Sequence, residues 1–188
     1  MDTAPTSNEI EQVPPRVCVL ASRYSDSVTG PMRQAAIDAY TARFGRATAD
    51  SLGVVDAPGA FELVALATAA IESGAYDGVV ALGCVIRGET DHDRYISQAV
   101  ANGLAALTTQ TGIPVAFGVI TANTPEQAAA RAGGAKGNKG AEAMDALLDA
   151  IDGMRRLYDA AADGVPARFS LSTNPTDKAA PGATAGSI

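Results

Sequence analysis

The chain has 188 residues, 47% of them hydrophobic, which is enough for a globular domain with a sizeable core. Its formal net charge of −7 argues against a nucleic-acid-binding surface, because such surfaces cluster Lys and Arg. The sequence has neither the apolar run of roughly 18 residues that predicts a membrane span nor the N-terminal pattern of a secretory signal. We therefore expect a cytoplasmic protein with no membrane partner.

The first half of the chain predicts two strands and two helices. They follow a polar, proline-containing stretch at residues 1–15, which we expect to be a flexible arm. The apolar run at residues 16–21 predicts a buried strand, and Pro31 is expected to open a helix that continues to about residue 44. A second strand is predicted at residues 51–57 and a short helix at residues 61–73.

The second half continues the alternation of strands and helices. Residues 79–86 form a continuous apolar run, which is typical of a strand at the centre of a parallel sheet. A helix is predicted at residues 91–108 and a fourth strand at residues 114–120. Two more helices are predicted near residues 125–133 and 140–158.

Two polar patterns predict helix caps. Thr90 and Asp93 have the spacing of a capping box at the start of the third helix. Thr124 is expected to cap the fourth helix, with Pro125 at its first position.

The alternation predicts an α/β fold, in which helices cover both faces of a parallel sheet. We expect one domain over residues 16–158 and a disordered tail over residues 159–188, where Ala, Asp, Gly, Pro, Ser and Thr prevail without periodicity. Cys18 and Cys84 lie inside apolar runs and are predicted to be buried, reduced thiols. One histidine and two distant cysteines cannot form a zinc site.

Ligands of such folds bind beyond the carboxyl ends of the strands, so the loops there are the candidate site. The loop after the third strand is the most informative. Gly88 makes a turn, and His92, the single histidine, is expected to start the next helix. Backbone N–H groups and the Thr90 hydroxyl can bind an anion there, and a histidine can move protons near neutral pH. A structural surface histidine is the alternative interpretation.

The other loops carry weaker signals. Tyr24 follows the first strand and either stacks on a flat heterocycle or is an ordinary tyrosine at the surface or core edge. The turn at residues 58–62 offers backbone N–H groups for hydroxyl or carbonyl oxygens, or simply starts a helix. Residues 131–140 are Gly-rich and cationic without a Walker A pattern. There Arg131 either clamps a phosphate or lies in a flexible, solvated loop.

Four segments together resemble the 6,7-dimethyl-8-ribityllumazine synthase family. They follow the family's order and spacing and lie within residues 16–152. The segments are Pro58-Gly59-Ala60-Phe61-Glu62; Gly83 to Thr90 with His92 and Tyr95; Pro114 to Thr121; and Arg131-Ala132-Gly133 with Gly137 to Glu142.

The resemblance implies a three-layer, flavodoxin-like α/β/α subunit with a four-stranded parallel sheet. It implies condensation of 5-amino-6-(D-ribitylamino)uracil with 3,4-dihydroxy-2-butanone 4-phosphate to 6,7-dimethyl-8-ribityllumazine, phosphate and water. No metal or organic cofactor is implied. Its partners would be small-molecule substrates and further copies of the chain, in a pentamer or an assembly of pentamers with sites between subunits. A flavin- or lumazine-binding protein, or a shell-forming protein with little turnover, is the alternative.

The resemblance also implies roles for individual residues. Tyr24 would stack on the pyrimidine, Val85 and Ile86 would line its pocket, and His92 would transfer protons. The ribityl chain would be held by Ala60, Phe61 and Glu62, and the phosphate by Gly88, Glu89 and Thr90. An adjacent subunit would supply Phe117, Arg131 and Lys139.

Overall fold

The computed structural model describes residues 13–45, 47–48 and 50–166. The chain divides into two compact units, Met1–Met154 and Arg155–Ile188. The four-stranded sheet and the four helices that precede residue 139 belong to the first unit. Most of the predicted N-terminal arm and C-terminal tail lies outside the described residues, but residues 159–162 of the predicted tail belong to the last helix of the structure.

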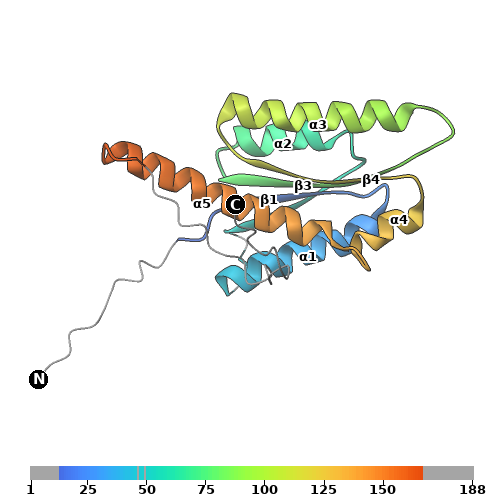
Figure 1. Cartoon of the computed structure of the whole chain (residues 1–188), viewed down its shortest axis with the longest axis horizontal. Coiled ribbons are helices and arrows are strands. Elements are labelled where there is room, and N and C mark those ends of the chain that lie inside the picture. Colours follow the sequence, from blue (N-terminus) through green and yellow to red (C-terminus); the bar gives the residue numbers. More distant parts are fainter. Residues whose placement is uncertain (1–12, 46, 49, 167–188) are drawn as a thin grey trace, which may run out of the picture. The chain divides into compact units, whose positions relative to one another are not determined.

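A four-stranded sheet forms the middle layer of the first unit (Figure 1). Its strands are β1 (Val17–Ser22), β2 (Leu52–Ala57), β3 (Gly78–Ile86) and β4 (Val115–Ala122), in the order β2-β1-β3-β4, and every pairing is parallel. The predicted four-stranded parallel sheet is therefore confirmed. Because the strands run in one direction, the loops after them gather at a single edge of the sheet, called here the carboxyl edge.

Helices cover both faces of the sheet, as predicted. They are α1 (Asp26–Phe44), α2 (Leu63–Glu72), α3 (His92–Thr111), α4 (Pro125–Ala130) and α5 (Lys139–Ala162). Figure 1 shows α2 and α3 on one face and α1 and α4 on the other. Each face has its own apolar core, with Val100 and Leu104 of α3 in one and Met32 and Tyr40 of α1 in the other. None of the helices in the described part of the chain is long and apolar enough to cross a membrane.

The start of α1 differs from the prediction. The helix begins at Asp26, so Pro31 lies inside it rather than at its first position. Proline removes one backbone hydrogen bond from a helix, and the Thr29 hydroxyl adds bonds of its own in this turn. The Thr29 hydroxyl donates to the carbonyl oxygens of Ser22, at 2.5 Å, and of Ser25, at 3.1 Å.

The end of α4 was also predicted wrongly. The helix stops at Ala130, and the chain then forms a short antiparallel hairpin of β5 (Ala132–Gly134) and β6 (Gly137–Asn138). Gly133 and Gly137 have φ values of 113° and 80°, a region that glycine adopts readily and other residues avoid. The predicted cap at the other end of α4 is confirmed, because Thr124 Oγ1 accepts a hydrogen bond from the Gln127 N–H at 3.3 Å.

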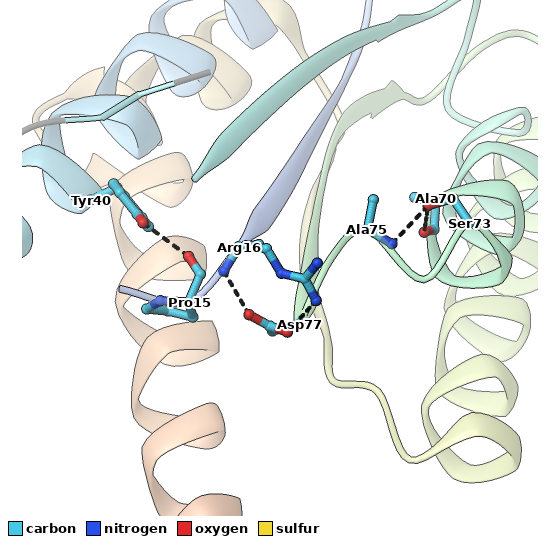
Figure 2. A network of polar contacts seen from close by, with 7 residues as sticks. All are labelled: Pro15, Arg16, Tyr40, Ala70, Ser73, Ala75 and Asp77. Carbon is cyan, nitrogen blue, oxygen red and sulfur yellow. Dashed lines mark hydrogen bonds and ion pairs between the residues drawn. The ribbon is translucent and has the colours of Figure 1, made fainter. Parts of the chain in front are cut away.

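The opposite edge of the sheet, called here the amino edge, is held by a compact polar network (Figure 2). Asp77 accepts hydrogen bonds from the backbone N–H of Arg16 at 2.8 Å and from its guanidinium at 2.9 Å. The buried Tyr40 hydroxyl donates to the Pro15 carbonyl at 2.9 Å. These bonds tie the beginning of β1 to the beginning of β3 and to α1.

Candidate functional site

A cavity of about 610 Å³ opens at the carboxyl edge, a size that suits a small-molecule ligand. It lies where the loops after β1, β2 and β3 meet. Its lining includes the predicted residues Tyr24, Ala60, Phe61, Glu62, Val85, Ile86, Gly88 and His92. It also includes Ser25, Gly59, Cys84, Arg87 and Ile96, which were not among the predicted site residues. Cys84 precedes the predicted pair Val85 and Ile86 on β3, and Arg87 follows the last residue of that strand, so the end of the strand was the available signal.

Two aromatic side chains of this cavity are unusually open to solvent. Tyr24, in the loop after β1, is 88% exposed, and Phe61, in the turn before α2, is 58% exposed. Exposing large rings forfeits the burial that ordinarily stabilises a fold. Both rings are therefore available to cover the faces of a flat ligand.

The turn before α2 presents polar groups to the same cavity. Glu62 is the N-cap residue of α2, but its side chain makes no capping hydrogen bond. A Cβ atom on Gly59 would lie 2.9 Å from Glu62 Oε2, so the glycine leaves room for that carboxylate. The uncapped helix start and the Glu62 carboxylate can serve as hydrogen-bond donor and acceptor for hydroxyl groups of a ligand.

His92 is held from two sides at the start of α3. Its Nδ1 shares a hydrogen bond of 2.6 Å with the Thr90 hydroxyl. Its ring lies against Gly88, where a Cβ atom would come within 2.6 Å of His92 Cε1. With Nδ1 occupied and the ring restrained, Nε2 is the nitrogen left to exchange a proton with a ligand.

The predicted capping box at α3 does not form. The N-cap residue is Asp91, one position later than the box requires, and no side chain caps the helix start. The Thr90 hydroxyl bonds to the imidazole instead. The free N–H groups of this first turn thus remain open to an anion.

The acidic residues around His92 lie outside the cavity. Glu89 and Thr90 are exposed and do not line it. Asp93 lines a neighbouring cavity of about 300 Å³ together with Arg87 and Ser97. Asp93, which follows His92 in the sequence, therefore lines a different cavity from the one that His92 lines.

Phe117, Arg131 and Lys139 do not line the His92 cavity of their own chain. Phe117 is half-exposed on β4, at the end of the strand order. Arg131 lines a third cavity, of about 470 Å³, next to α4. Lys139 begins α5 and lies with its Nζ 3.3 Å from a carboxylate oxygen of Glu142.

Both cysteines are buried and free, as predicted. Burial raises the pKa of the Cys18 thiol to about 11, and it also raises the pKa of Cys84. Cys84 lines the cavity but stays protonated at neutral pH, which makes it a poor nucleophile. Among the described residues, no cluster of three or more His, Cys, Asp or Glu side chains is arranged to hold a metal ion.

Comparison with known protein families adds to this geometry. The family model for 6,7-dimethyl-8-ribityllumazine synthase matches residues 14–155. This match spans most of the chain and includes the four strands of the parallel sheet, the residues that line the three cavities and the candidate site residues predicted from the sequence. The chain therefore belongs to the 6,7-dimethyl-8-ribityllumazine synthase family.

Proposed function

We propose that the protein condenses 5-amino-6-(D-ribitylamino)uracil with 3,4-dihydroxy-2-butanone 4-phosphate to form 6,7-dimethyl-8-ribityllumazine, releasing phosphate and water. The observation that carries this proposal is the His92 cavity. It combines exposed aromatic rings, an open helix start and a histidine restrained at Nδ1, in a member of this family. These groups suit a flat, hydroxylated and anionic pair of substrates.

The pyrimidine would lie against Tyr24, with Val85 and Ile86 as the apolar wall of its pocket. Tyr24 is exposed and can stack on the ring without displacing a core contact. The ribityl hydroxyls would bind at Ala60, Phe61 and Glu62, where backbone N–H groups and a carboxylate are available.

The phosphate would bind at the loop of Gly88, Glu89 and Thr90, beside the start of α3. The N-terminal N–H groups of that helix make no side-chain capping bond, and they attract negative charge. Gly88 has no side chain, so a ligand can approach its backbone closely. Glu89 would contribute through its backbone, because its carboxylate repels phosphate.

His92 would move protons during the reaction. The amine of the pyrimidine attacks the ketone, and water leaves as the imine forms. Phosphate then leaves, and ring closure releases a further molecule of water. Each departure needs a proton at an oxygen, and Nε2 is the nitrogen of His92 that has no hydrogen bond among the described residues. Holding both substrates in one cavity supplies much of the rate by proximity.

We also propose that the site is completed in a homo-oligomer, a pentamer or an assembly of pentamers. Phe117, Arg131 and Lys139 are separated from the His92 cavity in a single chain. An adjacent subunit would bring Phe117 to the pocket, Arg131 to the phosphate and Lys139 to the pyrimidine. A shared active site would make association obligatory for activity.

The test is to mix the purified full chain with both substrates and follow the fluorescence of the lumazine. We expect product well above the spontaneous rate, measured in the same buffer without protein. No acceleration would refute the proposal. If the same protein then bound lumazine or riboflavin tightly, a flavin- or lumazine-binding role would replace it.

A further inference from the structure

The cavity next to α4 is lined by a positively charged side chain, Lys136, to which the family resemblance assigned no role. Arg131 and Lys136 both line this cavity of about 470 Å³, together with Thr121 and Gln127. Five positions separate the two cations in the sequence, and both side chains are exposed. The hairpin of β5 and β6, between α4 and α5, brings the two side chains to the same cavity.

The hairpin folds back tightly on the end of α4. The Lys136 N–H donates to the Ala130 carbonyl at 2.9 Å, and the Lys139 N–H donates to the Arg131 carbonyl at 2.8 Å. Gly134 packs so closely that a Cβ atom there would lie 2.8 Å from the Cα of Ala130. This geometry places Lys136 beside Arg131, whereas Lys139 is the first residue of α5.

The two cations also differ from Lys139 in their charge environment. Within the described residues, neither Arg131 nor Lys136 forms an ion pair, whereas Lys139 pairs with Glu142. The one acidic lining residue is Glu126. Hydrogen bonds from the Thr124 side chain and from its own backbone lower the pKa of Glu126, so that carboxylate already has partners at the start of α4. The cavity therefore keeps an excess of positive charge in a chain whose net charge is −7.

We propose that Lys136 is a second cation of the anion-binding half-site that Arg131 begins, and that the pair binds the phosphate group of the butanone substrate. The inference deepens the proposed function and rests on it for the identity of the substrate. Arginine offers a planar pair of donors to a phosphate, and lysine adds a compact charge with donors of its own. Together they match a phosphate dianion better than either does alone.

The experiment uses inorganic phosphate as the probe, because its binding requires no turnover. Calorimetry on the full-length protein would compare the wild type with Lys136→Gln, Lys136→Arg and Arg155→Gln. Arg155 is exposed on α5 and lines none of the described cavities, so its variant removes one positive charge elsewhere as a matched control. Thermal unfolding of each variant would verify that it is folded.

We expect Lys136→Gln to weaken phosphate binding about tenfold, the effect of losing one charged hydrogen bond, and Lys136→Arg to restore most of the affinity. Arg155→Gln should bind as the wild type does. In the condensation assay, Lys136→Gln should raise the KM for the butanone phosphate about tenfold and leave the KM for the pyrimidine unchanged.

The inference and the proposed function can fail separately. If Lys136→Gln binds phosphate like Arg155→Gln, Lys136 is not part of the half-site, whether or not the protein catalyses the condensation. If the wild type shows no condensation but binds phosphate through Lys136, the half-site stands and the proposed reaction falls.

Discussion

The two edges of the sheet differ in how their polar groups are paired. At the amino edge, Arg16 pairs with Asp77, and the Tyr40 hydroxyl is bonded to Pro15 (Figure 2). At the carboxyl edge, Tyr24 stands exposed and Arg131 has no ion pair among the described residues. The polar groups named at the amino edge are paired within the described residues, whereas Tyr24 and Arg131 at the carboxyl edge remain open to a ligand or another subunit. The contrast supports the proposal that the carboxyl edge carries the functional site, and it does so without reference to any family.

Ser22 marks the same contrast inside the fold. It is the last residue of β1, at the carboxyl edge, and it is almost fully buried. Its hydroxyl oxygen is the one buried side-chain N or O atom in the described part of the chain that lacks a hydrogen-bond partner. Buried polar atoms in folded proteins are nearly always paired, so an unpaired one at this edge costs stability. Variants at the two edges should therefore test whether the carboxyl edge gives up stability that the amino edge supplies.

The largest effect is expected for Arg131→Ala at the carboxyl edge. Removing an arginine from a phosphate contact costs about 3 kcal/mol, so kcat/KM for the butanone phosphate should fall roughly 150-fold. The free energy of unfolding should stay within about 0.5 kcal/mol of the wild-type value, because the side chain is exposed. Steady-state kinetics with each substrate varied in turn gives the first quantity, and urea unfolding gives the second. An unchanged KM for the phosphate substrate would contradict the assignment.

His92→Ala should come next and should act on turnover. Acid–base catalysis by a side chain contributes about 100-fold or more, and we expect a loss near that lower limit, since proximity of the substrates persists. The KM values should change much less than kcat. His92→Gln is the matched variant, because it keeps polar atoms near Thr90 and cannot titrate. Full activity in both variants would remove His92 from the mechanism.

Tyr40→Phe at the amino edge should reduce stability and leave the chemistry intact. The substitution keeps the ring, which packs 4.9 Å from that of Phe44 between centroids, and removes only the buried hydroxyl. The Pro15 carbonyl then loses its partner, at a cost of about 1.5 kcal/mol. Urea unfolding measures the loss. A clear fall in kcat, measured where the variant is fully folded, would contradict the division between the edges.

Thr90→Val tests whether the hydroxyl that restrains His92 matters for turnover. Valine keeps the branched shape and loses the 2.6 Å hydrogen bond to Nδ1, so we expect kcat to fall about fivefold, near 1 kcal/mol. Thr90→Ser should behave as the wild type, because it retains the hydroxyl. If instead the KM for the butanone phosphate rises while kcat holds, the hydroxyl serves the phosphate rather than the histidine.

The smallest effect is expected for Ser22→Ala, and it should be favourable. Removing an unpaired, buried hydroxyl should raise the free energy of unfolding by about 0.5 kcal/mol. Thermal unfolding with the wild type as reference is sufficient. A loss of stability instead would show that the hydroxyl has a partner, and it would weaken the contrast between the edges.

Local patterns predicted most of the fold correctly. Continuous apolar runs defined β1 and β3 because strands buried on both faces must be apolar along their whole length. The cap of α4 followed from Thr124 and Pro125, which act on the turn immediately after them. The prediction of boundaries failed where contacts outside the helix itself were present. The start of α1 depends on the bond between Thr29 and Ser22, across the whole turn, and Pro31 alone predicted a later start.

The candidate site was likewise predicted in part. Tyr24, Phe61 and His92 could be named from the sequence because each lies in or at the end of a loop that follows a strand, and parallel strands bring such loops to one edge. The restraint on the His92 ring could not be predicted from the sequence, because a capping-box spacing predicted a different partner for Thr90. The meeting of Lys136 with Arg131 escaped prediction as well, because it depends on how the Gly-rich hairpin folds back on α4.

The sequence by itself therefore determined the alternation of strands and helices, the parallel sheet and the edge at which the candidate residues gather. These properties follow from hydrophobic periodicity and from the direction of the chain, which are local or topological. Only the tertiary structure decided which hydroxyl restrains His92, which cation accompanies Arg131, and which buried oxygen of β1 lacks a partner. Those properties depend on distances of a few ångströms between side chains, which packing fixes and local sequence patterns do not encode.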